Sequence, residues 1–301
     1  MTTMPPELAN SVQINSDSCM PIQSKNSTTQ FSGLATESPR RDIRFQWQPP
    51  GHAIDTSNLL KFTIITAIPL HSPIPTFWQN SLKSQNYRNW EHIVLEFGGT
   101  SSTAFWNSGY HPTQVGKAIA PLYSKTEALN KGLSLAKGDI IAFLPLQCTY
   151  KHERVLTKVA ELMLDPEIDL VYGNLEYHSR GKVRRVIKPG LPGRSCLEML
   201  KNGHLPLEEC VFVRREWWQF FGGLETSYHH SAGMARLLDI VTQPGLQTAY
   251  IDEVMIRSHR KTDASNTSLS RLLEEVTVFS KRNLLGVYLT NRSLHQRTPS
   301  D

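Results

Sequence analysis

Cysteine is scarce in this sequence and never occurs as a closely spaced pair. The 301 residues include four cysteines, and no two of them form a CxxC motif. They are Cys19, Cys148, Cys196 and Cys210. This pattern predicts no disulfide framework and is typical of a reducing compartment such as the cytosol.

Long hydrophobic segments are absent as well. No apolar run reaches the ~20 residues that a helix needs to span a bilayer. The first residues, MTTMPPELANS, have neither the basic region nor the apolar stretch of a secretory signal. We therefore expect a cytoplasmic protein without a transmembrane segment, in which any membrane contact is peripheral.

The charged residues show a basic excess. Lys and Arg number 32 against 27 Asp and Glu, which gives a formal net charge of +5 at pH 7. A positive balance suits an anionic partner such as a nucleotide diphosphate or a lipid head group, although a solvated basic surface accounts for most such charges. We expect no nucleic-acid partner.

Four regions differ in composition and periodicity. The first is rich in Ser, Thr, Asn, Gln and Pro, contains few apolar residues and shows no sustained period, which predicts a disordered polar extension. The predicted regions are the extension at 1–58, an α/β domain at 59–260, a C-terminal helix at 261–290 and a flexible tail at 291–301.

The domain opens with three successive strand–turn–helix units between Lys61 and Tyr150. The predicted strands are Phe62–Thr66, His92–Leu95 and Ile140–Leu144, and the predicted helices are 75–85 and Thr126–Ala136. Continuous apolar strands that alternate with helices predict a mostly parallel central sheet with helices on both faces. Because ligands bind outside the carboxyl ends of such strands, the turns that follow them are the candidate site.

The remaining part of the domain has weaker periodicity. The segment Ala104–Leu122 is expected to be a loop. Further along, the pattern predicts a helix at Val155–Leu164, a strand at Ile168–Val171, a hairpin from Asn174–Tyr177 and Val183–Ile187, a last strand at Leu246–Ile256 and a helix at Leu269–Leu289.

Several blocks occur in an order that resembles a known family. TIITAIP is followed by SLKSQNYRNWEHIVLEFGGTSST, then by EALNKGLSLAKGDIIAFL, and later by CVFVRREWWQFFGGLETSY. Together they resemble a family 2 glycosyltransferase from about Phe62 to Ile240. The resemblance implies the GT-A fold, an α/β domain that binds a nucleotide sugar.

The same resemblance implies a donor pocket. Its residues would be Thr66, Pro69, Glu96, Gly98, Asn130, Lys131 and Gln147. Glu96 stands where the family usually has Asp, and a carboxylate there can accept a hydrogen bond from the uracil N3–H of a UDP-linked sugar. An ordinary polar residue at a strand end is an equally good interpretation of Glu96.

The acids that the family uses for chemistry are missing from their usual positions. Where relatives carry metal-binding carboxylates, this chain has Pro145-Leu146-Gln147-Cys148. The acids near the usual catalytic base align with Gly233 and Ala235, and solvation is the simpler account of the nearby His229 and His230. We therefore expect no metal cofactor, no metal ligands and no catalytic residue at the usual places.

Three functional hypotheses follow. The first is a catalytically impaired family 2 glycosyltransferase, a pseudoenzyme acting in or alongside polysaccharide or glycolipid biosynthesis. The second is an active, metal-independent inverting enzyme that holds the diphosphate with Arg184, Arg185 or Lys188. The third is a non-enzymatic protein that binds a protein partner through its N-terminal arm or C-terminal helix.

Overall fold

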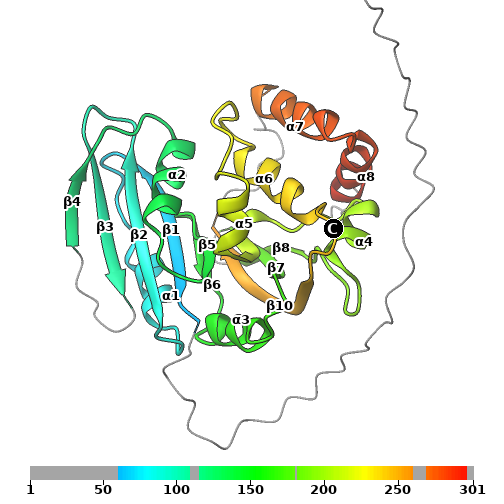
Figure 1. The fold of residues 1–301 in the computed structure, drawn as a ribbon, viewed down its shortest axis with the longest axis horizontal. Coiled ribbons are helices and arrows are strands. Elements are labelled where there is room, and N and C mark those ends of the chain that lie inside the picture. Colours follow the sequence, from blue (N-terminus) through cyan, green and yellow to red (C-terminus); the bar gives the residue numbers. More distant parts are fainter. Residues whose placement is uncertain (1–59, 109–114, 180–181, 260–268, 297–301) are drawn as a thin grey trace, which may run out of the picture. The chain divides into compact units, whose positions relative to one another are not determined.

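The computed structural model of the chain describes residues 60–108, 115–179, 182–259 and 269–296. The predicted polar extension at 1–58 lies outside these residues. Their main feature is a ten-stranded mixed sheet in the order β4-β3-β2-β1-β5-β9-β7-β10-β6, with β8 paired to β7 (Figure 1). The strands are β1 (Phe62–Pro69), β2 (Trp90–Phe97), β3 (Ser102–Ser108), β4 (Val115–Ile119), β5 (Ile140–Phe143), β6 (Cys148–Tyr150), β7 (Leu170–Ser179), β8 (Lys182–Ile187), β9 (Val211–Arg214) and β10 (Thr248–Ser258).

Parallel pairs at the centre of the sheet confirm the predicted α/β class. β1 runs parallel to both β2 and β5, and β7 runs parallel to β10. β9 joins these two groups, because it pairs antiparallel with both β5 and β7. The residues just before β9 therefore lie at the same edge of the sheet as the residues that follow β5.

Helices cover both faces of the sheet, as the sequence predicts. α2 (Lys125–Leu135) and α6 (Ala232–Val241) contribute Leu129 and Leu238 to the core on one face. α1 (Thr76–Lys83) and α3 (Val155–Met163) contribute Trp78 and Val159 to the other. The central strands are apolar on both sides for this reason. Shorter helices are α4 (Cys196–Lys201), α5 (Arg215–Phe220) and the 3-10 turn η2 (Glu208–Cys210).

The prediction of a loop over Ala104–Leu122 was wrong. This stretch contains most of β3 and all of β4, and Phe105 of β3 pairs with Val94 of β2. The local sequence pattern does not predict β3, because strand formation depends strongly on the neighbouring strands. Pairing with the edge of β2 stabilises β3.

The last predicted helix, Leu269–Leu289, is two helices. α7 (Leu269–Lys281) ends shortly before Asn283, whose φ of 56° is left-handed, and α8 (Leu285–Gln296) follows. Asn tolerates this backbone conformation better than most residues, so it can separate two helices without strain. α8 extends into the stretch from 291 that the sequence analysis assigns to a tail.

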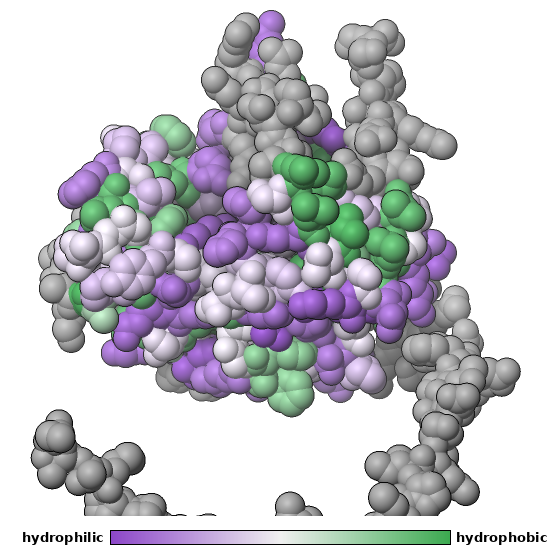
Figure 2. Space-filling view, turned by 90° about the horizontal axis from the view of Figure 1, so that it is seen from above, coloured by the Kyte–Doolittle hydropathy of each residue, from purple (hydrophilic) through white to green (hydrophobic). Residues whose placement is uncertain are grey.

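The last two helices carry hydrophobic side chains on their outside. Figure 2 shows a hydrophobic area on this side of the molecule. The large exposed hydrophobic residues of α7 and α8 are Leu269, Leu273, Leu285 and Leu289. Among the described residues, no helix combines the length and the apolar character needed to cross a membrane.

Candidate functional site

Thr66 of β1 and His92 of β2 form a buried, uncharged hydrogen-bonded pair. The Thr66 hydroxyl donates to the Leu144 carbonyl oxygen at 2.6 Å and lies 3.0 Å from Nε2 of His92. Because the hydroxyl proton is directed to Leu144, the His92 ring must be the donor to Thr66 Oγ1. Burial lowers the pKa of His92 to about 3, so the ring is uncharged. Thr66 thus ties β1 to the end of β5.

The other predicted donor residues of the first two strands lie nearer the surface. Pro69 is exposed at the end of β1 and pairs in register with Phe97. Glu96 is half-buried near the end of β2. Gly98 has a φ of +93°, a conformation that disfavours other residues, and its amide donates to the Leu122 carbonyl at 2.8 Å. The structure therefore brings these residues to the carboxyl edge.

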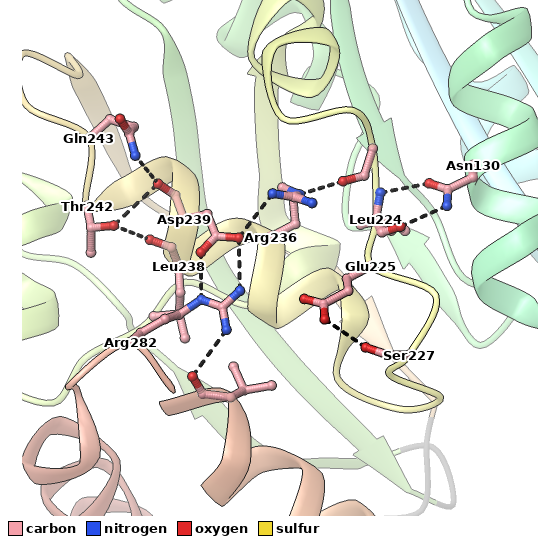
Figure 3. A network of polar contacts seen from close by, with 12 residues as sticks. Asn130, Leu224, Glu225, Ser227, Arg236, Leu238, Asp239, Thr242, Gln243 and Arg282 are labelled. Atoms are coloured by element: carbon pink, nitrogen blue, oxygen red, sulfur yellow. Dashed lines mark hydrogen bonds and ion pairs between the residues drawn. The ribbon is translucent and has the colours of Figure 1, made fainter. Parts of the chain in front are cut away.

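Asn130 uses its whole amide group to hold a loop. Its Nδ2 donates to the Leu224 carbonyl at 2.9 Å, and its Oδ1 accepts from the Leu224 amide at 2.7 Å (Figure 3). Gly223, with a φ of +87°, leaves space for Oδ1, which would lie 2.7 Å from a Cβ there. In this arrangement Asn130 positions the loop before α6. Lys131 follows it on α2 and is half-buried.

The loop after β5 has a fixed backbone. The indole nitrogen of Trp78 donates to the Pro145 carbonyl at 3.2 Å, and the His259 amide donates to the Gln147 carbonyl at 2.8 Å. Gln147 is half-buried, whereas Cys148 is fully buried at the start of β6. The loop therefore offers an amide side chain and a buried thiol where the resemblance places carboxylates.

A charged cluster that the sequence pattern does not indicate lies beside this loop. Oε1 of Glu176, on β7, accepts from Lys151 Nζ at 2.7 Å and from Arg257 Nε at 2.8 Å, and it lies 2.9 Å from His178 Nε2. Burial alone would raise the pKa of Glu176, but the hydrogen bonds from Lys151 and Arg257 outweigh it and hold the pKa below its ordinary value. The pairing of Arg257 with Glu176 across two parallel strands brings the cluster together.

A second cluster lies on the neighbouring part of β7 and β10. Asn174 is buried, its Nδ2 donates to Asp252 Oδ1 at 3.0 Å, and its Oδ1 accepts from the Tyr250 hydroxyl at 2.6 Å. Lys188 Nζ also donates to Asp252, at 3.1 Å. The hydrogen bonds from Asn174 and then from Lys188 lower the pKa of Asp252. The amide of Asn174 supplies a donor that an aspartate at this position would lack.

The start of α6 is held by a carboxylate from α7. Glu274 accepts from the backbone amides of His229, His230 and Ser231 at 3.1, 2.8 and 3.2 Å. The side chains of His229 and His230 are exposed, in agreement with the prediction that they are solvated. α6 is also anchored at Asp239, which accepts from Arg236 and from Arg282 (Figure 3).

The arrangement of parallel strands, covering helices and a polar carboxyl edge is that of the GT-A fold. Residues 79–217 match the family model for glycosyl transferase family 2. This match agrees with the resemblance of the sequence blocks to that family. No curated protein sequence gives a significant match.

Solved structures share the fold at low sequence identity. One is the mannosyltransferase PcManGT from Pyrobaculum calidifontis in complex with GDP-Man and Mn²⁺, with a TM-score of 0.52, 16% identity and coverage of 82% of this chain and 77% of that one. Another is S. aureus TarS 1–349 in complex with UDP-GlcNAc, with a TM-score of 0.57, 11% identity and coverage of 76% and 72%.

The prediction that no metal cofactor is involved is contradicted by these relatives, because PcManGT holds Mn²⁺ together with its nucleotide sugar. The error was to infer independence of metal from the loss of two carboxylates. The residues present nevertheless fit a metal poorly: in the described part of the chain, no group of three or more His, Cys, Asp or Glu side chains could hold one. Gln147 and Cys148 give one neutral oxygen and one soft ligand.

Proposed function

We propose that this chain binds a nucleotide-diphosphate sugar at the carboxyl edge of its sheet and acts as a catalytically impaired glycosyltransferase. The observation that carries the proposal is the charged cluster of Lys151, Arg257 and Glu176 beside the loop after β5. Two permanent cations face one carboxylate there, so the cluster keeps at least one positive charge. A diphosphate is the natural complement of such an excess.

Both cations of the cluster have donors to spare. The side chains of Lys151 and Arg257 are 32% and 34% exposed, so each is anchored on Glu176 while part of its head group faces solvent. A lysine carries three donors and an arginine five, and each uses one of them on Glu176 in the contacts described above. Glu176 thus fixes the two cations in position without consuming their ability to bind phosphate oxygens.

The nucleoside would lie towards β1 and β2. Glu96 and Gly98 stand at that end of the edge, where the resemblance places the donor base, and Pro69 closes the neighbouring turn. Gln147 lies between the nucleoside end and the cationic cluster along the chain, and it can donate or accept a hydrogen bond. The proposed donor site therefore runs from β2 across the end of β5 to β7 and β10.

Impaired catalysis is proposed because the usual acids are replaced. A general base alone contributes ~10²–10⁴-fold to such reactions, and stabilisation of the leaving group usually contributes more. Gln147 and Cys148 supply no carboxylate after β5. The role in or alongside polysaccharide or glycolipid biosynthesis, in the cytoplasm, rests on the family resemblance.

Calorimetric titration tests the donor site. UDP, UDP-GlcNAc, UDP-glucose and GDP-mannose should be titrated with and without Mn²⁺, and one of them should give saturable binding. Arg257→Gln should weaken that binding about tenfold, which corresponds to ~1.4 kcal/mol. Lys158→Met is the matched control, because Lys158 forms an ion pair with Glu253 away from the edge. Absence of heat and an unchanged melting temperature with millimolar ligand would reject the proposal.

A protein partner is a second proposal, favoured by one observation. The leucines 269, 273, 285 and 289 on the last two helices are exposed, and such side chains mark interaction sites when they gather on one surface. Leu273→Ser with Leu289→Ser should then abolish a concentration-dependent rise in mass measured by light scattering. A mass that stays monomeric at every concentration in the unaltered chain would reject self-association through this surface.

A further inference from the structure

Glu208 lies at the same edge of the sheet as the proposed donor site. It belongs to η2, which immediately precedes β9. β9 runs antiparallel to β5, with Phe212 paired to Ala142, so the chain before β9 continues past the carboxyl end of β5. The fold therefore brings a carboxylate to this edge from a segment that does not belong to a parallel strand.

The carboxylate of Glu208 occupies the space of a missing side chain on α6. Gly233 lies in the first turn of that helix, and a Cβ built there would overlap Oε2 of Glu208 and lie 2.8 Å from its Cδ. Only a glycine leaves room for the carboxylate in this position. The first turn of a helix also favours a negative charge beside it, because its amide groups carry partial positive charge.

Three other carboxylates near this edge are engaged by several donors. Glu176 has Lys151, Arg257 and His178 around it, Asp252 accepts from Asn174 and Lys188, and Glu274 accepts three backbone amides. Burial raises the pKa of each of these three carboxyl groups, but the hydrogen bonds that they accept outweigh burial and lower the pKa below its ordinary value. A carboxylate stabilised in this way is a weak proton acceptor.

Glu208 differs from these carboxylates in its contacts. Within the described residues its hydrogen-bond and ion-pair partner is Lys125, whose Nζ lies 3.4 Å from Oε1. Oε2, which faces Gly233, has no donor among these contacts. The side chain is 26% exposed, so the carboxylate is open to solvent or to a bound molecule.

We propose that Glu208 is the general base for the acceptor hydroxyl in the sugar transfer, an inference that rests on the proposed function. The acceptor O–H proton passes to Glu208 Oε2 while the acceptor oxygen bonds to the anomeric carbon of the donor. The bond from that carbon to the diphosphate oxygen breaks, and its electron pair leaves with the nucleoside diphosphate. Glu208 then releases the proton to water. Impairment of the enzyme would thus lie on the donor side.

The first experiment measures release of UDP or GDP from the nucleotide sugar that binds best in calorimetry, with water or an added hydroxyl acceptor. Glu208→Gln keeps the size of the side chain and should lower the turnover rate ~10²–10⁴-fold, while the donor dissociation constant stays within about twofold. Glu209→Gln is the matched control, since it removes the adjacent carboxylate and should leave turnover unchanged.

A second pair of variants separates proton transfer from a structural role. Glu208→Ala should be inactive, and added formate or azide should restore part of its turnover, because a small anion can enter the vacated space and accept the proton. Adding Gly233→Asp to Glu208→Ala should also restore turnover by returning a carboxylate to the same space from α6. A residue that only holds η2 in place would give neither recovery.

The outcomes distinguish the two proposals. If no nucleotide sugar binds, the proposed function fails and the role of Glu208 fails with it. If a donor binds but turnover is equal in the unaltered chain and in Glu208→Gln, or absent from both, only the role of Glu208 is overturned. Loss of turnover in Glu209→Gln to the same degree would also overturn it, because the effect would then follow general negative charge.

Discussion

The two halves of the carboxyl edge treat their polar residues differently. In the half formed by β1, β2 and α2, which we call the neutral half, the uncharged side chains of Thr66 and Asn130 donate hydrogen bonds to backbone carbonyl groups. In the half formed by β7, β10 and η2, which we call the charged half, the ionised side chains of Glu176 and Asp252 accept hydrogen bonds from charged and amide groups. The first half is fixed by neutral hydrogen bonds, and the second by charge.

This difference shows how the chain accommodates the replaced acids. Buried Asn174 carries an amide and donates to Asp252, so the negative charge lies on the neighbouring strand β10. Gly233 stands where the resemblance places a family acid, and the carboxylate of Glu208 fills the space beside it. In both cases a carboxylate lies within contact distance of an uncharged residue. At both positions the negative charge is therefore carried by a neighbouring residue.

The largest effect on stability is expected from removing the hydroxyl group of Thr66, which hydrogen-bonds to Leu144 and His92. Thr66→Val keeps the shape of the side chain but leaves the buried Leu144 carbonyl and the His92 ring nitrogen without their partner. Each unsatisfied group costs about 1–3 kcal/mol, so the free energy of unfolding should fall by about 2–4 kcal/mol. Urea denaturation measures the change. Thr66→Ser keeps the hydroxyl and should lose less than half as much; equal losses would show that the hydroxyl is not the cause.

A somewhat smaller effect is expected from placing an acid at Asn174, in the half of the edge formed by β7, β10 and η2. Asn174→Asp removes the donor to Asp252 and places a second carboxylate in a buried position 1% exposed. We expect a loss of about 1–3 kcal/mol in the free energy of unfolding at pH 7. The loss should shrink as the pH falls and the new carboxyl group takes up a proton. A variant as stable as the unaltered chain at pH 7 would contradict the assigned role of Asn174.

The parallel core could be predicted from sequence because its signal is local. Phe62, Thr63, Ile64 and Ile65 form a run of apolar and β-branched residues, which identifies a strand covered on both faces, and the spacing of α2 is equally regular. β3 and β4 escaped prediction because they depend on the free edge of β2. The break at Asn283 escaped because Leu269–Leu289 keeps helical spacing on both sides of it.

The candidate site was predictable only where it follows a strand. Pro69, Glu96 and Gly98 could be placed at the edge from their position in the strand–turn–helix units. The cluster around Glu176 could not, since it depends on the register that sets Arg257 beside Glu176 and on Lys151 reaching across from the end of β6. The relation of Glu208 to Gly233 joins residues 25 positions apart in sequence through packing alone.

The smallest of the expected effects is a pH dependence that comes from the neutral half. Burial lowers the pKa of His92 from 6.5 to about 3, so the folded chain binds this proton less readily than the unfolded chain. The stability contributed by the neutral ring is complete above pH 6.5 and is lost as the pH falls towards 3. Between pH 6.5 and pH 5.5 the loss should be about 1 kcal/mol.

His92→Gln tests this origin, because glutamine can donate to Thr66 Oγ1 and does not titrate. Urea denaturation at the two pH values should show a decrease smaller by about 1 kcal/mol in the variant than in the unaltered chain. His152 and His259, whose pKa values are lowered by burial first and then by neighbouring cations or histidines, remain in the variant and give it a residual decrease. If both chains lose the same stability, His92 is not the cause of the decrease. The lowered pKa values of Glu176 and Asp252 also make the chain less stable as the pH falls, but they act at lower pH.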